Sequence, residues 1–554
     1  MDFSQIALLM VVAASMAMIA KLLKQPMIVG YLFAGVILSA FGFVSDKHTL
    51  QELGQVGVSL LLFSVGLEMN MKEILSLGKS AFVSGIAQVI LTTVLGFLFV
   101  YTLGFSIIPA FFIAFSLTFS STIVVIKLLS EKNELQTLSG RLTLGFLLVQ
   151  DLIAVFSLIF LSAFSEGGLN SLSIVLLIAK SALLFGILFL LSKYVLSHAF
   201  EKFNESSSEL LFVVSIAWAL GLSALVGGPL GLSLEIGGFL AGLSLSNLPA
   251  NLQISGKTRN IRDFFLTIFF FVLGTDIVVG EISQIIVVAL LLSLFVLISN
   301  PLVQFLTLSL LGYKKKVSFT SGLSIAQVSE FSLIFIILAK SLGFVGDREV
   351  SIVILVAVIT MLGSTYLILY TEKIYQKVKG FLSLFERKSM DVSVQSKFSD
   401  LSGHVVLVGA DRTGMVLISR LKKNFSFVVV DYNPKIINSL SEQKIPCVFG
   451  DINDEDIQKA VNLDKASLVI STSSHLHDSL VLLKNINSMK ERPKIILKAK
   501  SKSDAIALYE NKATYVLIPE VLSGEHIRHL LKNYGFSERL NKVGKSHHNR
   551  LREQ

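Results

Sequence analysis

The sequence is poor in charged residues and nearly free of cysteine. Lysine, arginine, aspartate and glutamate make up 16% of the 554 residues, whereas a soluble globular domain carries about 25%. Hydrophobic residues make up 53% of the chain, so the shortage of charge indicates a membrane protein. The single cysteine, Cys447, excludes a disulfide framework and any metal site built from several cysteines.

The charged residues are distributed unevenly. Residues 1–372 are apolar, while residues 373–554 have an ordinary soluble composition. Crossing a hydrocarbon core of about 30 Å takes roughly 20 apolar residues, and thirteen segments of the apolar part fit this length approximately. These candidate spans are residues 3–20, 26–44, 53–68, 80–103, 106–127, 141–165, 172–195, 208–226, 232–248, 262–279, 283–312, 317–341 and 350–372.

Lysine and arginine alternate between the loops. Loops after odd-numbered spans hold fifteen of them, and loops after even-numbered spans hold three. Because cytoplasmic loops carry the excess of positive charge, we predict an inner-membrane protein with its N-terminus outside and its C-terminal domain in the cytoplasm. This pattern explains most of the net charge of +9, so the lipid bilayer, and not nucleic acid, is the expected partner.

Two candidate spans are interrupted by polar residues. Thirteen spans divide as six, one and six, so spans seven apart run antiparallel, as an inverted repeat requires. The fifth span and its repeat partner, the twelfth, both carry polar clusters. The clusters are Ser116, Thr118, Ser120, Ser121 and Thr122, and Ser324, Gln327, Ser329, Glu330 and Ser332. They predict broken, crossing helices around an ion site; hydroxyls that bond back to their own helix are the structural alternative.

Asp151 is the strongest candidate for the ion-binding group. It follows Arg141 by ten residues and therefore lies about 15 Å into the bilayer, near the midplane. A carboxylate at this depth is costly, which makes it a candidate functional residue. Because one carboxylate can hold either a proton or a cation, competition for Asp151 would couple the two fluxes. A buried aspartate bonded to the backbone or to a basic group is the structural alternative, and Glu330 is either a ligand or a helix support.

Six segments of residues 1–372 resemble, in the same order, the monovalent cation:proton antiporter-2 family, in particular its Kef-type potassium efflux branch. They are LLLFSVGLEM (60–69), SSTIVVIKLL (120–129), LVQDLIAV (148–155), LGLSLEIGGFLAG (230–242), FFLTIFFFVLG (264–274) and AQVSEFSLI (326–334). The resemblance implies a homodimer in which a dimerisation bundle flanks a moving core. It also implies that Gln150 and Asp151 bind the ion, K⁺ or Na⁺, in electroneutral exchange for one proton.

One stretch departs from the Kef pattern. Glutathione-gated Kef proteins carry an acidic loop before the tenth span, whereas residues 254–264, ISGKTRNIRDF, are basic here. This departure argues against glutathione gating and against the ancillary Kef subunit.

Residues 403–525 read as alternating strands and helices, which predicts a Rossmann-like α/β domain. GADRTG (409–414) occupies the dinucleotide fingerprint position, and Asp431 closes the second strand about 20 residues on, where a ribose would be bound. Asp411 replaces the middle glycine and would repel phosphate, which Arg412 would offset. The predicted nucleotide contacts are Gly409, Asp411, Arg412, Thr413, Gly414, Asp431 and Asp451.

This domain resembles the regulator-of-potassium-conductance (TrkA-N type) domain, including GDIND at 450–454. The resemblance implies an adenine nucleotide as regulatory ligand. Asp411 favours AMP over NAD, with ATP or ADP as further alternatives, and a domain that serves only dimerisation or gating is the other interpretation. We predict a transmembrane domain over 1–372, a connector over 373–402, the regulatory domain over 403–525 and a basic tail over 526–554.

The leading hypothesis is a potassium:proton antiporter, not an enzyme. A sodium:proton antiporter of the same fold is the first alternative. A membrane oxidoreductase using NAD is disfavoured by the damaged fingerprint and by the absence of a substrate domain. A channel is disfavoured because the sequence contains no selectivity filter such as TVGYG.

Overall fold

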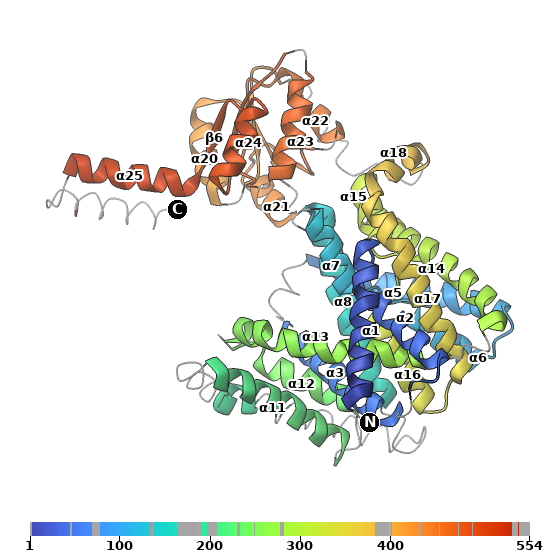
Figure 1. Ribbon diagram of the computed structural model, residues 1–554. Helices are drawn as coiled ribbons and strands as arrows, with labels where there is room; N and C mark the ends of the chain where they lie inside the picture. Colours follow the sequence, from blue (N-terminus) through green and yellow to red (C-terminus); the bar gives the residue numbers. More distant parts are fainter. Residues whose placement is uncertain are drawn as a thin grey trace. The chain divides into compact units, whose positions relative to one another are not determined.

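The computed structural model divides into two compact units, Met1–Arg387 and Lys388–Gln554, which are described separately. The residues that it describes are 3–44, 47–68, 78–132, 134–135, 137–162, 186, 188, 190–196, 208–229, 233–248, 250–277, 282–382, 398, 401–410, 412–431, 434–453, 455–474, 476–489, 491–534 and 541. The first unit is helical, and the second contains a parallel sheet (Figure 1).

The first unit consists of apolar helices at the positions of the candidate spans. They are α1 (Phe3–Leu22), α2 (Met27–Ala40), α3 (Lys47–Glu68), α5 (Gly78–Thr102), α6 (Ile107–Ser116), α7 (Thr122–Glu131), α8 (Leu138–Ser162), α11 (Ser208–Gly227), α12 (Leu234–Leu245), α13 (Asn251–Thr275), α14 (Ile282–Leu310), α15 (Lys315–Leu323), α16 (Glu330–Ser341) and α17 (Asp347–Leu369). Within the described residues, six helices are long and apolar enough to cross a membrane, and shorter apolar helices accompany them. The seventh candidate span, with Lys180, lies largely outside the described residues.

The fifth and twelfth candidate spans are broken helices, as the polar clusters predict. Residues 117–121 separate α6 from α7, and residues 324–329 separate α15 from α16. Ser121 caps α7 by accepting a hydrogen bond from Val124 N at 3.3 Å. Ser329 caps α16 by accepting one from Phe331 N at 3.1 Å. Hydroxyl side chains at these positions satisfy orphan N–H groups of the new helix, which is why the chain can start a helix inside an apolar segment.

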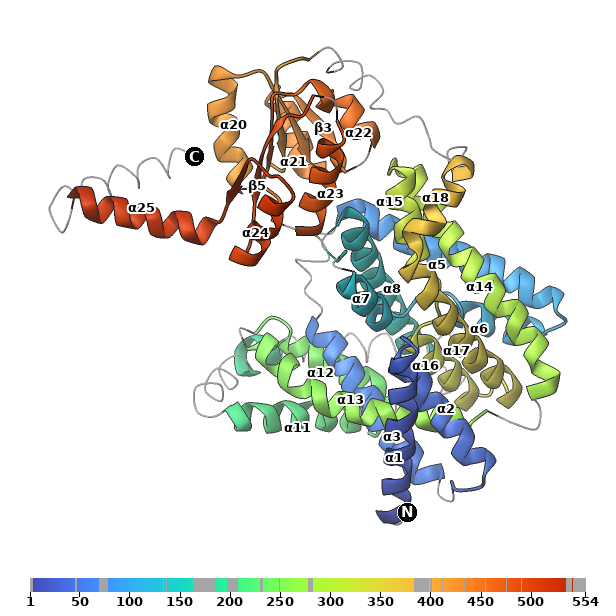
Figure 2. The ribbon, with the colours of Figure 1, turned by 45° about the horizontal axis from the view of Figure 1, so that its top comes forward.

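The helices of the first unit form two groups (Figure 2). In one group α3 packs against α12 and α13, and α2 packs against α1 and α13. In the other, α5 packs against α6, α8 and α14, while α17 packs against α14 and α16. The first group contains spans 1–3 and 8–10, and the second contains spans 4–6 and 11–13. Each group therefore combines equivalent spans of the two repeats, which lie seven spans apart.

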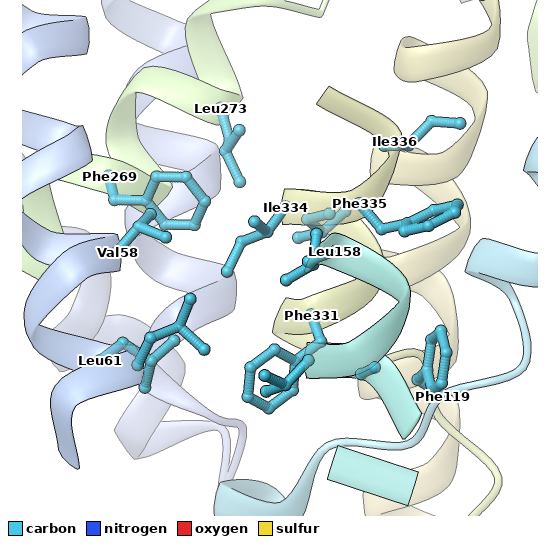
Figure 3. Packing of buried hydrophobic residues seen from close by; sticks show 14 of the residues in the cluster. Val58, Leu61, Phe119, Leu158, Phe269, Leu273, Phe331, Ile334, Phe335 and Ile336 are labelled. Carbon is cyan, nitrogen blue, oxygen red and sulfur yellow. The ribbon is translucent and has the colours of Figure 1, made fainter. Parts of the chain in front are cut away.

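The two groups meet through apolar side chains. Figure 3 shows Val58 and Leu61 of α3 and Phe269 of α13 facing Leu158 of α8 and Ile334 of α16. All of these residues belong to one buried hydrophobic cluster. Because apolar contacts are non-directional, such an interface imposes few specific pairings between the groups.

A short amphipathic helix, α18 (Thr371–Leu382), follows the last apolar helix. Tyr375 and Leu382 on its apolar face pack with Phe305 of α14. The rest of the predicted connector lies almost entirely outside the described residues.

The second unit is a six-stranded parallel sheet in the order β3-β2-β1-β4-β5-β6. The strands are β1 (Val405–Val408), β2 (Phe427–Asp431), β3 (Cys447–Phe449), β4 (Leu468–Ser471), β5 (Lys494–Lys498) and β6 (Tyr515–Leu517). The helices are α20 (Arg412–Asn424), α21 (Pro434–Glu442), α22 (Glu455–Ala460), α23 (Leu476–Asn487), α24 (Lys502–Glu510) and α25 (Pro519–Tyr534). Two hydrophobic clusters cover the sheet, and the predicted Rossmann-like fold is confirmed.

His404, directly before β1, makes this unit sensitive to acid. The side chain is fully buried, and its Nε2 forms a hydrogen bond with Val461 O at 2.8 Å. Burial lowers the pKa of the imidazole from 6.5, and the backbone bond opposes this shift in part. The folded state therefore binds a proton less readily than the unfolded chain. The contribution of the neutral His404 to the free energy of unfolding is therefore fully present above pH 6.5. It is lost as the pH falls below that value, because the unfolded chain then binds the proton more readily.

We expect the unfolding midpoint of the second unit to fall more steeply between about pH 7.5 and about pH 5.5 in the wild type than in His404→Gln. Glutamine keeps an amide donor but does not titrate in this range. Cys447 is buried and is the only cysteine, so its labelling by a thiol reagent during heating reports on this unit within the full chain. Equal slopes for the two proteins would contradict the role of His404.

Candidate functional site

The candidate site lies where the breaks of the two discontinuous helices cross. Ser329 N donates a hydrogen bond to Phe119 O at 2.9 Å, and Ser120 Oγ donates to Ile325 O at 2.8 Å. Each break thus supplies a carbonyl to the other, which compensates for the interrupted helical bonding. All residues of the two sequence clusters from Ser116 to Ser121 and from Ser324 to Ser332 are buried.

Amide side chains cover the carbonyls that end α6. Gln88 Nε2 and Gln150 Nε2 each donate to Thr118 O at 3.2 Å, and Asn300 Nδ2 donates to Leu117 O at 3.3 Å. Gln150 Nε2 also bonds Gln88 Oε1. The C-terminal end of a helix carries partial negative charge, so these N–H donors stabilise the break without adding a basic group.

Asp151 lies beside the start of α7. Thr122 Oγ1 donates a hydrogen bond of 2.9 Å to Asp151 Oδ2, and the Asp151 side chain is 6% exposed. Its neighbour Gln150 accepts a bond from Ser120 N at 3.2 Å through Oε1. A helix N-terminus carries partial positive charge, and Asp151 is the acidic residue that lies beside it at this crossing.

Glu330 and Gln327 occupy the corresponding place in the second broken helix. Glu330 is in the first turn of α16 and is 2% exposed. Gln327 Nε2 donates to Ser121 O and to Ser324 O at 3.4 Å each. Each half-helix N-terminus at the crossing therefore has one carboxylate beside it, Asp151 for α7 and Glu330 for α16.

The structure thus brings together all the residues of the membrane unit that the sequence selects for the site: Thr118, Ser120, Ser121, Thr122, Gln150, Asp151, Gln327 and Glu330. Sequence reasoning missed Gln88 and Asn300. The available signal was a single amide residue inside an otherwise apolar span, which costs free energy unless it is hydrogen-bonded.

The second unit forms a turn of the nucleotide-binding type at the end of β1. Gly409 has φ +87°, a conformation that favours glycine, and Thr472 Oγ1 donates to its carbonyl at 3.0 Å. Asp431 Oδ2 accepts a hydrogen bond from Ala410 N at 2.8 Å and is 6% exposed. Asp431 therefore orders the turn itself.

The other predicted nucleotide contacts surround this edge of the sheet. Thr413 and Gly414 belong to the first turn of α20, and Asp451 follows β3, where its Oδ1 accepts from Asn453 N at 2.9 Å. Asp411 and the side chain of Arg412 lie outside the described residues. The carboxyl ends of β1 and β2 and the start of α20 meet here, which is the position where doubly wound folds bind nucleotides.

Each of the two units matches a known protein-family model. The transmembrane model "Sodium/hydrogen exchanger" matches residues 7–370, and the TrkA-N domain model matches residues 405–519. The chain belongs to the sodium/hydrogen exchanger family and carries a C-terminal TrkA-N domain. It is a multi-pass membrane transporter of the cation/proton antiporter type, and the resemblance to Kef-type antiporters is confirmed.

Among its relatives is "Putative cation/proton antiporter YbaL" of Escherichia coli (strain K12). It is 26% identical over 528 residues, which cover 92% of this chain and 94% of the relative. "Putative K(+) efflux antiporter KefB" of Alkalimonas amylolytica is 28% identical over 521 residues, covering 92% and 77%. Among solved structures, the sodium proton antiporter MjNhaP1 of Methanocaldococcus jannaschii matches with a TM-score of 0.49 and 16% identity, covering 68% of this chain and 96% of that one.

Proposed function

We propose that the protein exchanges K⁺ for a proton, one for one, through alternating access around Asp151. The observation that carries the proposal is the buried Asp151 carboxylate bonded to Thr122 at the start of α7. A proton and a cation neutralise the same carboxylate, so they exclude one another. If Asp151 is the only group that changes occupancy, each full cycle moves no net charge. Na⁺ is the alternative substrate.

The two helix groups provide the moving parts of this proposal. The crossing that holds Asp151 belongs to the group of α5–α8 and α14–α17, and its interface with the group of α1–α3 and α11–α13 is apolar. A rigid displacement of one group along the other would expose Asp151 to each side in turn, and the apolar contacts in Figure 3 impose no directional bonds on that movement. In a homodimer, the group of α1–α3 and α11–α13 would form the fixed scaffold.

We further propose that an adenine nucleotide, with AMP favoured over NAD, ATP or ADP, regulates transport from the TrkA-N domain. The ordered turn at Gly409 and the buried Asp431 support a nucleotide site. The proposed location is the bacterial-type inner membrane, with the N-terminus outside and the TrkA-N domain in the cytoplasm, as the distribution of lysine and arginine favours.

The test is a transport assay in liposomes that hold an acid-inside pH gradient. We expect external K⁺ to collapse the gradient, choline to leave it intact, and a clamped membrane potential to have no effect on the rate. Collapse by Na⁺ alone would change the substrate but keep the mechanism. AMP, ADP, ATP and NAD, each added at the TrkA-N side, should identify the regulator by a change in rate. No response to either cation, with or without nucleotide, would contradict antiport.

A further inference from the structure

Three buried oxygen atoms at the start of α16 have no hydrogen-bond partner among the described residues. They are Oε1 of Gln327, Oε2 of Glu330 and Oγ of Ser332, and these residues are 0%, 2% and 0% exposed. Buried polar atoms are nearly always satisfied, because leaving one without a partner forfeits its hydration without replacement. Three of them at one end of one helix indicate that a further atom or ion lies among them.

The side chains of Gln327 and Glu330 lie beside Ser121, in the break of the other helix. Gln327 Nε2 donates to the Ser121 carbonyl at 3.4 Å, and the Glu330 carboxyl interacts with the hydroxyls of Ser121 and Ser329. These contacts hold the amide nitrogen of Gln327 and place the Glu330 carboxyl beside the hydroxyls of the two serines. The remaining oxygen of each side chain is left for another partner.

The missing partner must carry positive charge or donate a hydrogen bond. The amide oxygen of Gln327 and an ionised Glu330 are both acceptors, so neither satisfies the other. A proton on Glu330 is the competing occupant, because it would donate to the amide oxygen, and the count of bound cations decides between the two. Among the described residues, no lysine or arginine forms an ion pair with Glu330. Arg262 of α13 acts on Glu330 electrostatically, but its guanidinium is paired with Asp263 at 2.8 Å. A buried carboxylate without an ion pair, beside a second free oxygen, is a donor set suited to a monovalent cation.

We propose that Gln327 and Glu330, beside Ser121, form a second monovalent-cation site that is distinct from Asp151. The two sites are adjacent, because Ser121 precedes Thr122, the residue bonded to Asp151. The inference rests on the proposed antiport and deepens it. The cation at Glu330 is a resident one that neutralises this carboxylate throughout the cycle, so only the charge at Asp151 changes and the exchange remains one for one.

The site is tested by counting bound cations. Full-length purified protein is dialysed at alkaline pH against radioactive Rb⁺ in one arm and radioactive Na⁺ in the other. We expect two cations per chain for the wild type in at least one arm. Asp151→Asn should lose one of them, and Glu330→Gln should lose the other. Gln327→Leu, which removes one oxygen and no charge, should weaken the second site about tenfold while leaving the first unchanged.

The melting temperature separates a cation site from a purely structural carboxylate. A bound cation stabilises the folded state, so Rb⁺ or Na⁺ should raise the melting temperature of Asp151→Asn, in which only the second site remains. The rise should disappear when Glu330→Gln is added to Asp151→Asn. If Glu330 served only as the negative charge beside the N-terminus of α16, neither cation would change the melting temperature of Asp151→Asn. The melting temperature and the elution volume of each variant show whether it is folded.

Three results would overturn the proposal. Glu330→Gln that still binds two cations would remove Glu330 from the site. A wild type that binds one cation, lost in Asp151→Asn, would leave the proposed antiport standing without a second site. No binding in either arm would contradict both. The first two outcomes thus separate failure of the second site from failure of the proposed antiport.

Discussion

Asp151→Asn should reduce cation-driven proton movement to the rate of empty liposomes. Asparagine has nearly the same shape as aspartate and can still accept the Thr122 hydrogen bond, so the crossing should remain folded. An amide neither binds a proton at neutral pH nor carries the negative charge that a cation needs. Because the proposed exchange runs through this one carboxylate, we expect complete loss with both K⁺ and Na⁺. The measurement is collapse of an acid-inside gradient at matched protein content.

Asp347→Asn is the matched control for Asp151→Asn. Asp347 is also an aspartate of the membrane unit, but its side chain is 65% exposed and paired with Lys340 at the start of α17. An exposed pair of this kind contributes little to stability, and the control should transport at the wild-type rate. Substantial exchange by Asp151→Asn would show that another group carries the proton, and the proposed mechanism would fail.

Gly242→Val should prevent stable folding of the helix group built on α3. Gly242 lies in α12 where that helix crosses α3, and a Cβ built on it would overlap the carbonyl oxygen of Phe63 and lie 2.9 Å from Leu67 N. Both obstacles are backbone atoms, so no rotamer change relieves the clash and the helices must separate. Overpacking typically costs about 1–3 kcal/mol, and a backbone clash at a close helix crossing should reach or exceed the upper end.

Gly221→Val separates this clash from the general effect of valine in a helix. Gly221 lies in the neighbouring helix α11, and a Cβ there would meet no atom of the described residues within 4 Å. Both substitutions change helix propensity equally. We expect Gly221→Val to elute as a single species and to melt near the wild-type temperature, while Gly242→Val aggregates or melts far below it. Similar behaviour of the two variants would refute the close crossing of α3 and α12.

The distribution of apolar residues made much of the architecture predictable. Apolar length located the membrane helices, and the change of composition after the last apolar segment predicted a separate α/β part, which the structure shows in the unit that begins at Lys388. Hydroxyl residues inside the fifth and twelfth spans revealed the two breaks, because a new helix inside a membrane needs caps for its N–H groups. These signals are local, so a single sequence carries them.

The amides that support the crossing were not predictable in the same way. Gln88 and Asn300 are separated from the fifth span in sequence, and both donate to carbonyls that exist only because α6 ends inside the unit. An isolated amide in an apolar span gives no indication of which carbonyl it meets. The same holds for Gln327, whose contact with Ser121 joins positions 206 residues apart.

The sequence by itself indicated a membrane protein with two broken helices, and it predicted Asp151 as a carboxylate at mid-depth. Those features follow from hydropathy, helical rise and the cost of burying charge, which act within one segment. Tertiary structure alone decided that each half-helix N-terminus has its own carboxylate, and that Gln327 and Glu330 leave two oxygen atoms without partners. Contacts between two breaks depend on how the helices cross, and a crossing is set by packing between segments far apart in the chain.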